Sequence, residues 1–308
     1  MAREGTAAGG RDAAARHRAA AEGLAGRLPA LQIAADRVAI TVMQGVHGRR
    51  RVGTGEAFWQ FRRYEPGDPM SRIDWRQTAK REHVFVRETE WEAAQSVWLW
   101  RDNSASMRWR SSADLPEKAE RADQLTLALI AVLIRGGERV ALLGQSLRPA
   151  SGRGALSRLA AGLADAEQLE HGLPPEAPLP RHATVTLIGD FFSPLPMVDR
   201  HWRALAARGV SGLALQIVDP AEETLPFAGR TRFEGLELEG EALIPRVESV
   251  REDYAAAFRR HREGLASIAR AVGWRFMVHR TDRSAESALM ALWLALARGG
   301  GAGRWKSA

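Results

Sequence analysis

Most of the chain alternates between short apolar runs and longer amphipathic segments. The short runs are rich in Val, Leu, Ile and Trp and are bounded by polar residues, which is typical of β-strands. The longer segments repeat apolar positions at helical spacing. The predicted strands span residues 84–90, 96–100, 139–143, 185–188, 213–218 and 274–278. The predicted helices, which alternate with the strands from residue 96 onward, span residues 114–135, 154–163, 195–207, 254–272 and 285–297.

This alternation predicts the fold class. Strands that alternate with helices at such spacing form an α/β fold with a doubly wound, mostly parallel sheet. The first long helix carries start and stop signals: Asp114 and Glu117 form a candidate capping box, and Gly136 ends the apolar periodicity. A turn-rich insertion at about 219–245 interrupts the pattern.

Changes in local amino-acid composition divide the chain into three predicted segments. Residues 1–35 are rich in Ala, Gly and Arg, and we expect them to be flexible or helical. Residues 36–90 contain Gly, Arg, Trp, Phe and short apolar alternations, which predict a smaller N-terminal lobe that contains β-strands. Residues 91–308 form the α/β domain with its insertion.

The amino-acid composition is that of a folded globular protein. Hydrophobic residues make up 45% and charged residues 26% of the 308 residues, as in soluble globular proteins. The chain has no Cys, so disulfides and cysteine-ligated metal centres are excluded. We find no apolar run long enough to cross a membrane and no signal-peptide pattern, so we expect a cytoplasmic protein without direct membrane insertion.

Polar residues that follow two of the predicted strands are the main candidates for chemistry. Asp102, Ser104 and Ser106 follow the strand 96–100, and Asp190 follows the strand 185–188. Ligands of doubly wound sheets bind beyond the carboxyl ends of the strands, so these oxygens are expected to converge. Two hydroxyls, carboxylates and water suit Mg²⁺, although another divalent cation fits too. The alternative is that Asp102 and the serines only satisfy backbone amides of a turn.

Two groups of residues resemble known proteins. Asp102-x-Ser104-x-Ser106 with Asp190 resembles the metal-ion-dependent adhesion site of von Willebrand factor A-like domains. A second group resembles the signature of the domain-of-unknown-function 58 family, bacterial proteins that carry such a domain. The residues of this second group are Arg63, Tyr64, Glu65, Pro66, Gly67, Asp68, Arg72, Ile73, Asp74, Trp75, Thr78, Ala79, Lys80 and Arg81.

The resemblance has consequences for fold, site and partners. It implies a sheet of von Willebrand A type and a partner that is a MoxR-type AAA+ ATPase. The resemblance also implies a role as a non-enzymatic adaptor in the activation or assembly of another protein. A domains usually add a threonine ligand, and in this chain only Ser151 stands in the corresponding loop, which is a weak substitute.

The signature of the smaller lobe has two interpretations. Its polar and aromatic residues either face a partner or form a buried, charge-paired junction between the lobes, and the bulk of the aromatic rings favours the junction. The residues concerned are Arg63, Tyr64, Asp68, Arg72, Asp74 and Trp75.

Two other functions compete with the adaptor. The net charge of +7 makes a nucleic-acid-binding protein an alternative, but the arginines are interspersed with acids, so nucleic acid is not the expected partner. A metal-dependent phosphohydrolase that uses Asp102 and Asp190 is a second alternative. The sequence shows no general base beside these carboxylates and no nucleophile motif, and we therefore predict no catalytic residues and no enzyme.

Overall fold

A computed structural model describes most of the chain beyond residue 57. The described residues are 58–64, 70, 73–80, 83–89, 96–145, 148–166, 172–177, 179–181, 183–236 and 240–299. They belong to two compact units, one of residues 49–95 and one that includes residues 96–308. The segment 1–35, predicted to be flexible or helical, lies outside the described residues.

The smaller unit is built on a two-stranded antiparallel sheet. Strand β1 (Phe58–Arg63) pairs with β2 (Phe85–Thr89), and the short helix α2 (Trp75–Thr78) lies between them in the sequence. The helix is tied to β2 because the Phe85 N–H donates to the Thr78 hydroxyl at 3.1 Å. The lobe therefore contains β-strands, as predicted.

The larger unit contains a five-stranded sheet in the order β4-β3-β5-β6-β9. Every neighbouring pair of strands in this sheet is parallel. The strands are β3 (Ser96–Arg101), β4 (Arg139–Leu142), β5 (Thr184–Gly189), β6 (Ser211–Val218) and β9 (Arg275–Arg280).

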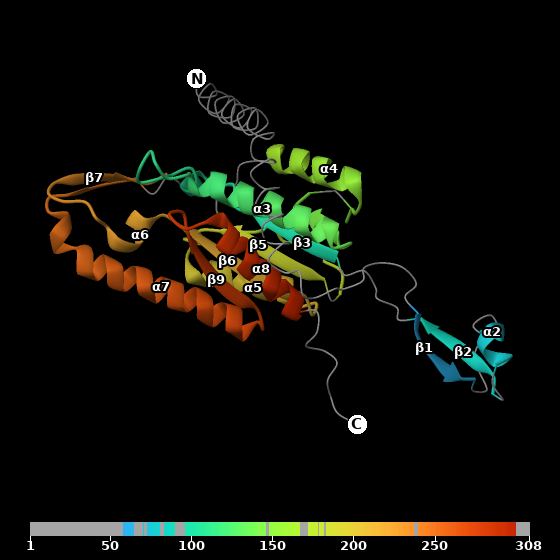
Figure 1. Ribbon diagram of the computed structural model, residues 1–308. Coiled ribbons are helices and arrows are strands. Elements are labelled where there is room, and N and C mark those ends of the chain that lie inside the picture. The colour runs from blue at the N-terminus through green and yellow to red at the C-terminus, as the bar shows by residue number, and fades with distance from the viewer. Residues whose placement is uncertain are drawn as a thin grey trace, which may run out of the picture. The chain divides into compact units, whose positions relative to one another are not determined.

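Helices cover both faces of this sheet (Figure 1). Residues of α3, α4 and α8 share a buried core with one face, and residues of α5 and α7 share a second core with the other face. Leu99 belongs to the first core and Trp100 to the second, because successive side chains of a strand point to opposite faces. The helices are α3 (Lys118–Arg135), α4 (Arg153–Ala164), α5 (Leu195–Ala206), α7 (Arg251–Ala271) and α8 (Ala285–Gly299).

The α/β, doubly wound fold is thus confirmed, while two local predictions need correction. Helix α3 begins at Lys118, and its capping box is formed by Glu117 and Glu120 rather than by Asp114 and Glu117. Asp114 lies in the preceding loop, where its own N–H donates to the Ser112 hydroxyl at 3.2 Å.

The predicted turn-rich insertion contains regular structure. It opens with the short helix α6 and continues with an antiparallel pair, β7 and β8, before a 3-10 turn, η3, leads into α7. These elements are α6 (Pro220–Thr224), β7 (Thr231–Glu234), β8 (Glu241–Ile244) and η3 (Val247–Ser249). Among the described residues, no helix has the length and apolar character needed to cross a bilayer.

Candidate binding site at the carboxyl edge of the sheet

Asp102 and Asp190 follow neighbouring strands at the place where the strand order reverses. The chain leaves β3 to form β4 on one side and returns to form β5 on the other side. In doubly wound sheets, ligands bind at the carboxyl ends of strands beside such a reversal. The Asp102 N–H donates to the Ile188 carbonyl at 2.8 Å, so the loop after β3 runs alongside the end of β5.

A row of hydrogen bonds joins the predicted site residues. The Asp102 Oδ1 accepts a hydrogen bond from the Ser104 N–H at 2.9 Å. The Ser104 and Ser106 hydroxyls lie 3.1 Å apart, and the Ser106 hydroxyl donates to Asp190 Oδ2 at 2.8 Å. Asp102, Ser104 and Asp190 are at most 1% exposed. The structure therefore brings four of the predicted residues together.

Lys118 completes this cluster, and it was not among the residues predicted from the sequence. It is the first residue of α3 and is 1% exposed. Its Nζ donates to Asp190 Oδ2 at 2.9 Å and to Glu222 Oε1 at 2.5 Å. The ammonium group also lies 4.9 Å from the centre of the Phe192 ring, a distance typical of a cation–π contact.

The charges of the cluster shift the pKa values of its members. Burial by itself lowers the pKa of Lys118, but Asp190 and Glu222 outweigh that effect and raise the pKa above its ordinary value. Burial raises the pKa of Glu222, and the neighbouring Lys118 opposes part of that rise. Lys118 therefore keeps its positive charge at neutral pH.

Helix α6 presents Glu222 to Lys118. Asp219 caps this helix by accepting a hydrogen bond from the Ala221 N–H at 2.8 Å, and Glu222 Oε2 accepts one from the Asp219 N–H at 2.8 Å. The second carboxylate oxygen of Asp219 accepts a hydrogen bond from the Ser111 N–H at 2.9 Å. The loops after β3, β5 and β6 are therefore connected at one edge of the sheet.

The backbone is strained at Phe191, directly after Asp190 in the candidate site. The backbone of Phe191 has a φ angle of +54°, which residues other than glycine rarely adopt, and its side chain is fully buried. It packs against Trp100 and Trp202, with ring centres 6.2 and 5.4 Å away. Its carbonyl lies 2.8 Å from Nε2 of His261 on α7. Strained residues of this kind cluster at functional sites.

Two glycines leave room for the Asp102 side chain. A Cβ at Gly189 would lie 2.7 Å from the Asp102 Cβ and 2.9 Å from its Oδ2. A Cβ at Gly172 would lie 2.6 Å from the same Oδ2. Both distances are too short for a real contact, so a side chain at either position would displace the carboxylate.

Comparison with known proteins places the chain in a family. Residues 60–264 match the family described as "Protein of unknown function DUF58". The chain belongs to the DUF58 family. Uncharacterized proteins of Mycobacterium bovis and Mycobacterium tuberculosis are 28% identical to this DUF58 protein over 275 residues, which cover 84% of this chain and 86% of each relative.

Solved structures give weaker likenesses to this DUF58 protein. An aerotolerance-related membrane protein from Bacteroides fragilis matches with a TM-score of 0.39 at 15% identity, over 66% of this chain and 99% of that chain. The conserved hypothetical protein BatB from Bacteroides thetaiotaomicron matches with a TM-score of 0.38 at 15% identity, over 67% of this chain and 98% of that chain. These scores carry no conclusion about function.

The oxygen atoms of the cluster are of the type that Mg²⁺ prefers, but their arrangement fits the ion poorly. Asp190 Oδ2 already accepts hydrogen bonds from Ser106 and Lys118. An ion at roughly 2.1 Å from that oxygen would lie within about 5 Å of the Lys118 ammonium, where two cations repel. Among the described residues, no group of three or more His, Cys, Asp and Glu side chains forms a metal site. Mg²⁺ therefore stays a prediction that this geometry does not favour.

Ser151, the weak fifth ligand of the sequence prediction, lies elsewhere. Its neighbour Ala150 pairs in antiparallel fashion with Val140, near the start of β4. Because this pairing is antiparallel, the chain after Ala150 continues toward the amino end of β4, and Ser151 is exposed there. The structure therefore does not bring Ser151 to Asp102 and Asp190, which lie at the carboxyl edge.

The signature residues of the smaller lobe are partly described. Asp68 and Arg72 lie outside the described residues. The Tyr64 N–H donates to the Val84 carbonyl at 2.8 Å, and Arg63 is exposed at the end of β1. These contacts place Arg63 and Tyr64 where the two-stranded sheet ends.

Asp74 and Trp75 start the short helix of the same lobe. The Asp74 N–H donates to the Phe85 carbonyl at 2.9 Å, and the Asp74 carbonyl accepts a hydrogen bond from the Thr78 N–H at 3.0 Å. Trp75 is 64% exposed in its own unit. The predicted packing of this ring at a junction between the lobes stays a prediction.

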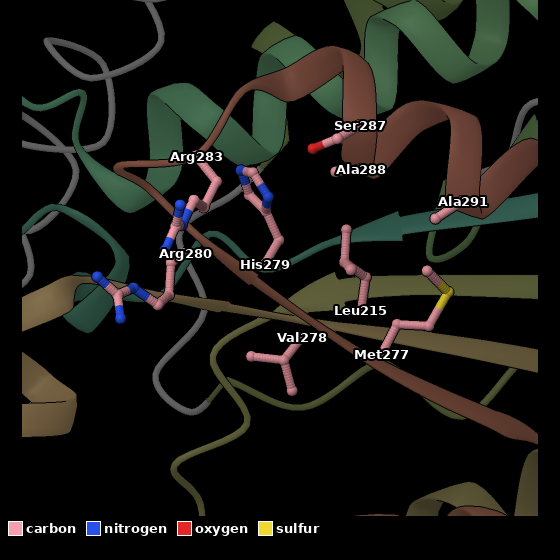
Figure 2. A pocket seen from close by; sticks show the side chains of 9 residues that line it. All are labelled: Leu215, Met277, Val278, His279, Arg280, Arg283, Ser287, Ala288 and Ala291. Carbon is pink, nitrogen blue, oxygen red and sulfur yellow. The ribbon is translucent and has the colours of Figure 1, made fainter.

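A separate pocket of about 260 Å³ lies beside the edge strand β9 (Figure 2). Residues of β9 and α8 line it, among them His279 and Arg280 of β9 and Ser287 and Ala288 of α8 (Figure 2). Val278 of β9 also lines it, and its side chain points away from that of His279 (Figure 2). None of the predicted site residues lines this pocket.

Proposed function

We propose that this DUF58 protein is a non-enzymatic adaptor that binds other proteins through the carboxyl edge of its sheet. Its partner is a MoxR-type AAA+ ATPase, with which it activates or assembles another protein. We place this activity in the cytoplasm. The observation that carries the proposal is a buried polar cluster held by hydrogen bonds and an ion pair, with exposed aromatic and basic side chains in the same strand-end loops.

The cluster is better suited to binding than to catalysis. Asp190 Oδ1 accepts a hydrogen bond from the Phe192 N–H at 3.2 Å, and Oδ2 accepts two from Ser106 and Lys118. Both oxygens are thus engaged, whereas a general base needs an oxygen within reach of the proton that it removes. The strand-end loops are held in place by these bonds, as a rigid recognition surface requires.

The rim supplies the side chains that protein interfaces use. Phe192 is 37% exposed directly after Asp190 and Phe191, and Arg108 and Arg110 are exposed in the loop after β3. That loop stays at the edge because the Lys118 N–H donates to the Trp109 carbonyl at 3.2 Å. Aromatic residues and arginine are enriched at the centres of interfaces, and the arginines favour an acidic partner surface.

The test is the affinity of the full chain for a purified MoxR-type ATPase from the same organism. Phe192→Ala and Arg110→Ala should each weaken binding by about 10-fold or more, because few residues carry most of an interface's energy. Leu294→Ala is the matched control, since Leu294 is 41% exposed on α8 and is not part of the rim. Equal affinities for wild type and the two rim variants would overturn the proposal.

A further inference from the structure

Lys118 is an unusual choice of residue for this chain. Only three lysines, Lys80, Lys118 and Lys306, occur among its 44 basic residues. One of them, Lys118, is buried between two carboxylates that follow different strands, at 2.9 Å from Asp190 and 2.5 Å from Glu222. An ammonium group is a compact point charge with three donors, whereas a guanidinium is a larger planar fork.

The position of the ammonium is that of a bridging cation. Through Asp190 it holds the loop after β5, and through Glu222 it holds α6 after β6. Ser106 shares the Asp190 oxygen, so the loop after β3 joins the same bridge. A divalent ion in an oxygen-lined site connects loops in the same way.

We infer that the ammonium group of Lys118 is the resident cation of the carboxyl-edge site, in the place where a divalent ion was expected from the sequence. The site then keeps its shape without Mg²⁺ or Mn²⁺. The consequence for partner binding rests on the proposed function: association at this edge needs no divalent ion.

The first experiment measures thermal unfolding of the full chain with millimolar MgCl₂ or MnCl₂ and with EDTA. Wild type should unfold at the same temperature in all three conditions. Lys118→Met should unfold at a lower temperature, because Asp190 and Glu222 lose their buried counter-charge. Mn²⁺ should then raise the unfolding temperature of the variant in a saturable manner.

Two further variants protect this test against a failure to fold. The double variant Lys118→Met with Glu222→Gln removes one positive and one negative charge, and it should fold and bind Mn²⁺ through the remaining carboxylates. Lys80→Met is the matched control, since Lys80 is an exposed lysine of the smaller unit, and it should behave as wild type.

Two outcomes overturn the inference. One is a wild-type protein that Mg²⁺ or Mn²⁺ stabilises, with the effect lost in Asp190→Asn. The other is the absence of any response to Mn²⁺ in both Lys118 variants, because the site would then not be a cation site that lysine fills.

The second experiment repeats the ATPase binding measurement in EDTA. Unchanged affinity supports the inference, and affinity that EDTA abolishes while the fold stays intact contradicts it. Absence of association with and without Mg²⁺ would defeat the proposed function instead, and the metal titration above would still decide the identity of the cation.

Discussion

Lys118 carries a positive charge into the interior between carboxylates that follow two different strands. It is 1% exposed, and removal of a partner from such a pair leaves an uncompensated buried charge. The sequence prediction found Asp102, Ser104, Ser106 and Asp190 because each follows a strand end. It missed Lys118 because a lysine at a helix start usually lies in solvent, and the one available signal was the rarity of lysine in this chain.

At Gly189, the space that Asp102 occupies excludes any side chain. Gly189→Ala would place a Cβ 2.7 Å from the Asp102 Cβ, so the carboxylate and its hydrogen bonds must move. We expect a loss of about 1 to 3 kcal/mol in the free energy of unfolding, measured by chemical denaturation. Gly154→Ala is the control, because a Cβ there meets nothing within 4 Å and alanine favours the helix. Equal stability of Gly189→Ala and wild type would show that Asp102 lies elsewhere.

His279 makes stability depend on pH. Burial, aided by the charge of Arg121, lowers the pKa of His279 from 6.5 to about 4 in the folded protein. The unfolded chain therefore binds the proton first as pH falls, and stability is lost between about pH 6.5 and pH 4. The loss is on the order of 3 kcal/mol at the acid end of this window.

The measurement is the free energy of unfolding of wild type and His279→Gln across that pH range. The variant should show a flatter dependence on pH below 6.5, whatever its stability in neutral solution. Parallel curves for the two proteins would mean that His279 is not the group that titrates.

At the scale of elements, the apolar periodicity of the sequence predicted the positions of the main helices and strands. It predicted the residues at which they begin and end less accurately. Periodicity located α5 at residues 195–207, and the structure has it at Leu195–Ala206. The start of α3 was misplaced because Asp is a preferred N-cap residue and Glu is not, so Asp114 with Glu117 matches the capping pattern better than Glu117 with Glu120 does. The helix α6 was missed because five residues are too few to show a helical period.

Helix α6 nevertheless organises the edge through Asp219. Asp219→Ala should remove the hydrogen bonds to the Ala221 and Ser111 N–H groups and cost about 1 to 2 kcal/mol of stability. Amide hydrogen exchange should become faster in the loop that contains Ser111 and in α6. Asp253→Ala, an exposed acid in the first turn of α7, serves as the control. Unchanged exchange in both segments would contradict the role of Asp219.

At the scale of the whole molecule, the parallel sheet decides where the chemistry lies. Alternating strands and helices predicted this sheet, and its strand ends predicted which loops carry the site. The reversal of strand order between β3 and β5 was not predictable, because periodicity does not tell which strands are neighbours. The same limit applies to Ser151, whose distance from the edge follows from the pairing of Ala150 with Val140.

The central claim is that Lys118 is a buried, ion-paired cation, and the chemical reactivity of its amine tests it most directly. The full chain is labelled with an amine-reactive acetylating reagent, and the modification of each lysine is followed by mass spectrometry, with the exposed Lys80 as internal reference. Lys118 should react at least about 100-fold more slowly than Lys80 in the folded protein and at a similar rate after denaturation. Labelling of Lys118 at the rate of Lys80 in the folded protein would contradict the account.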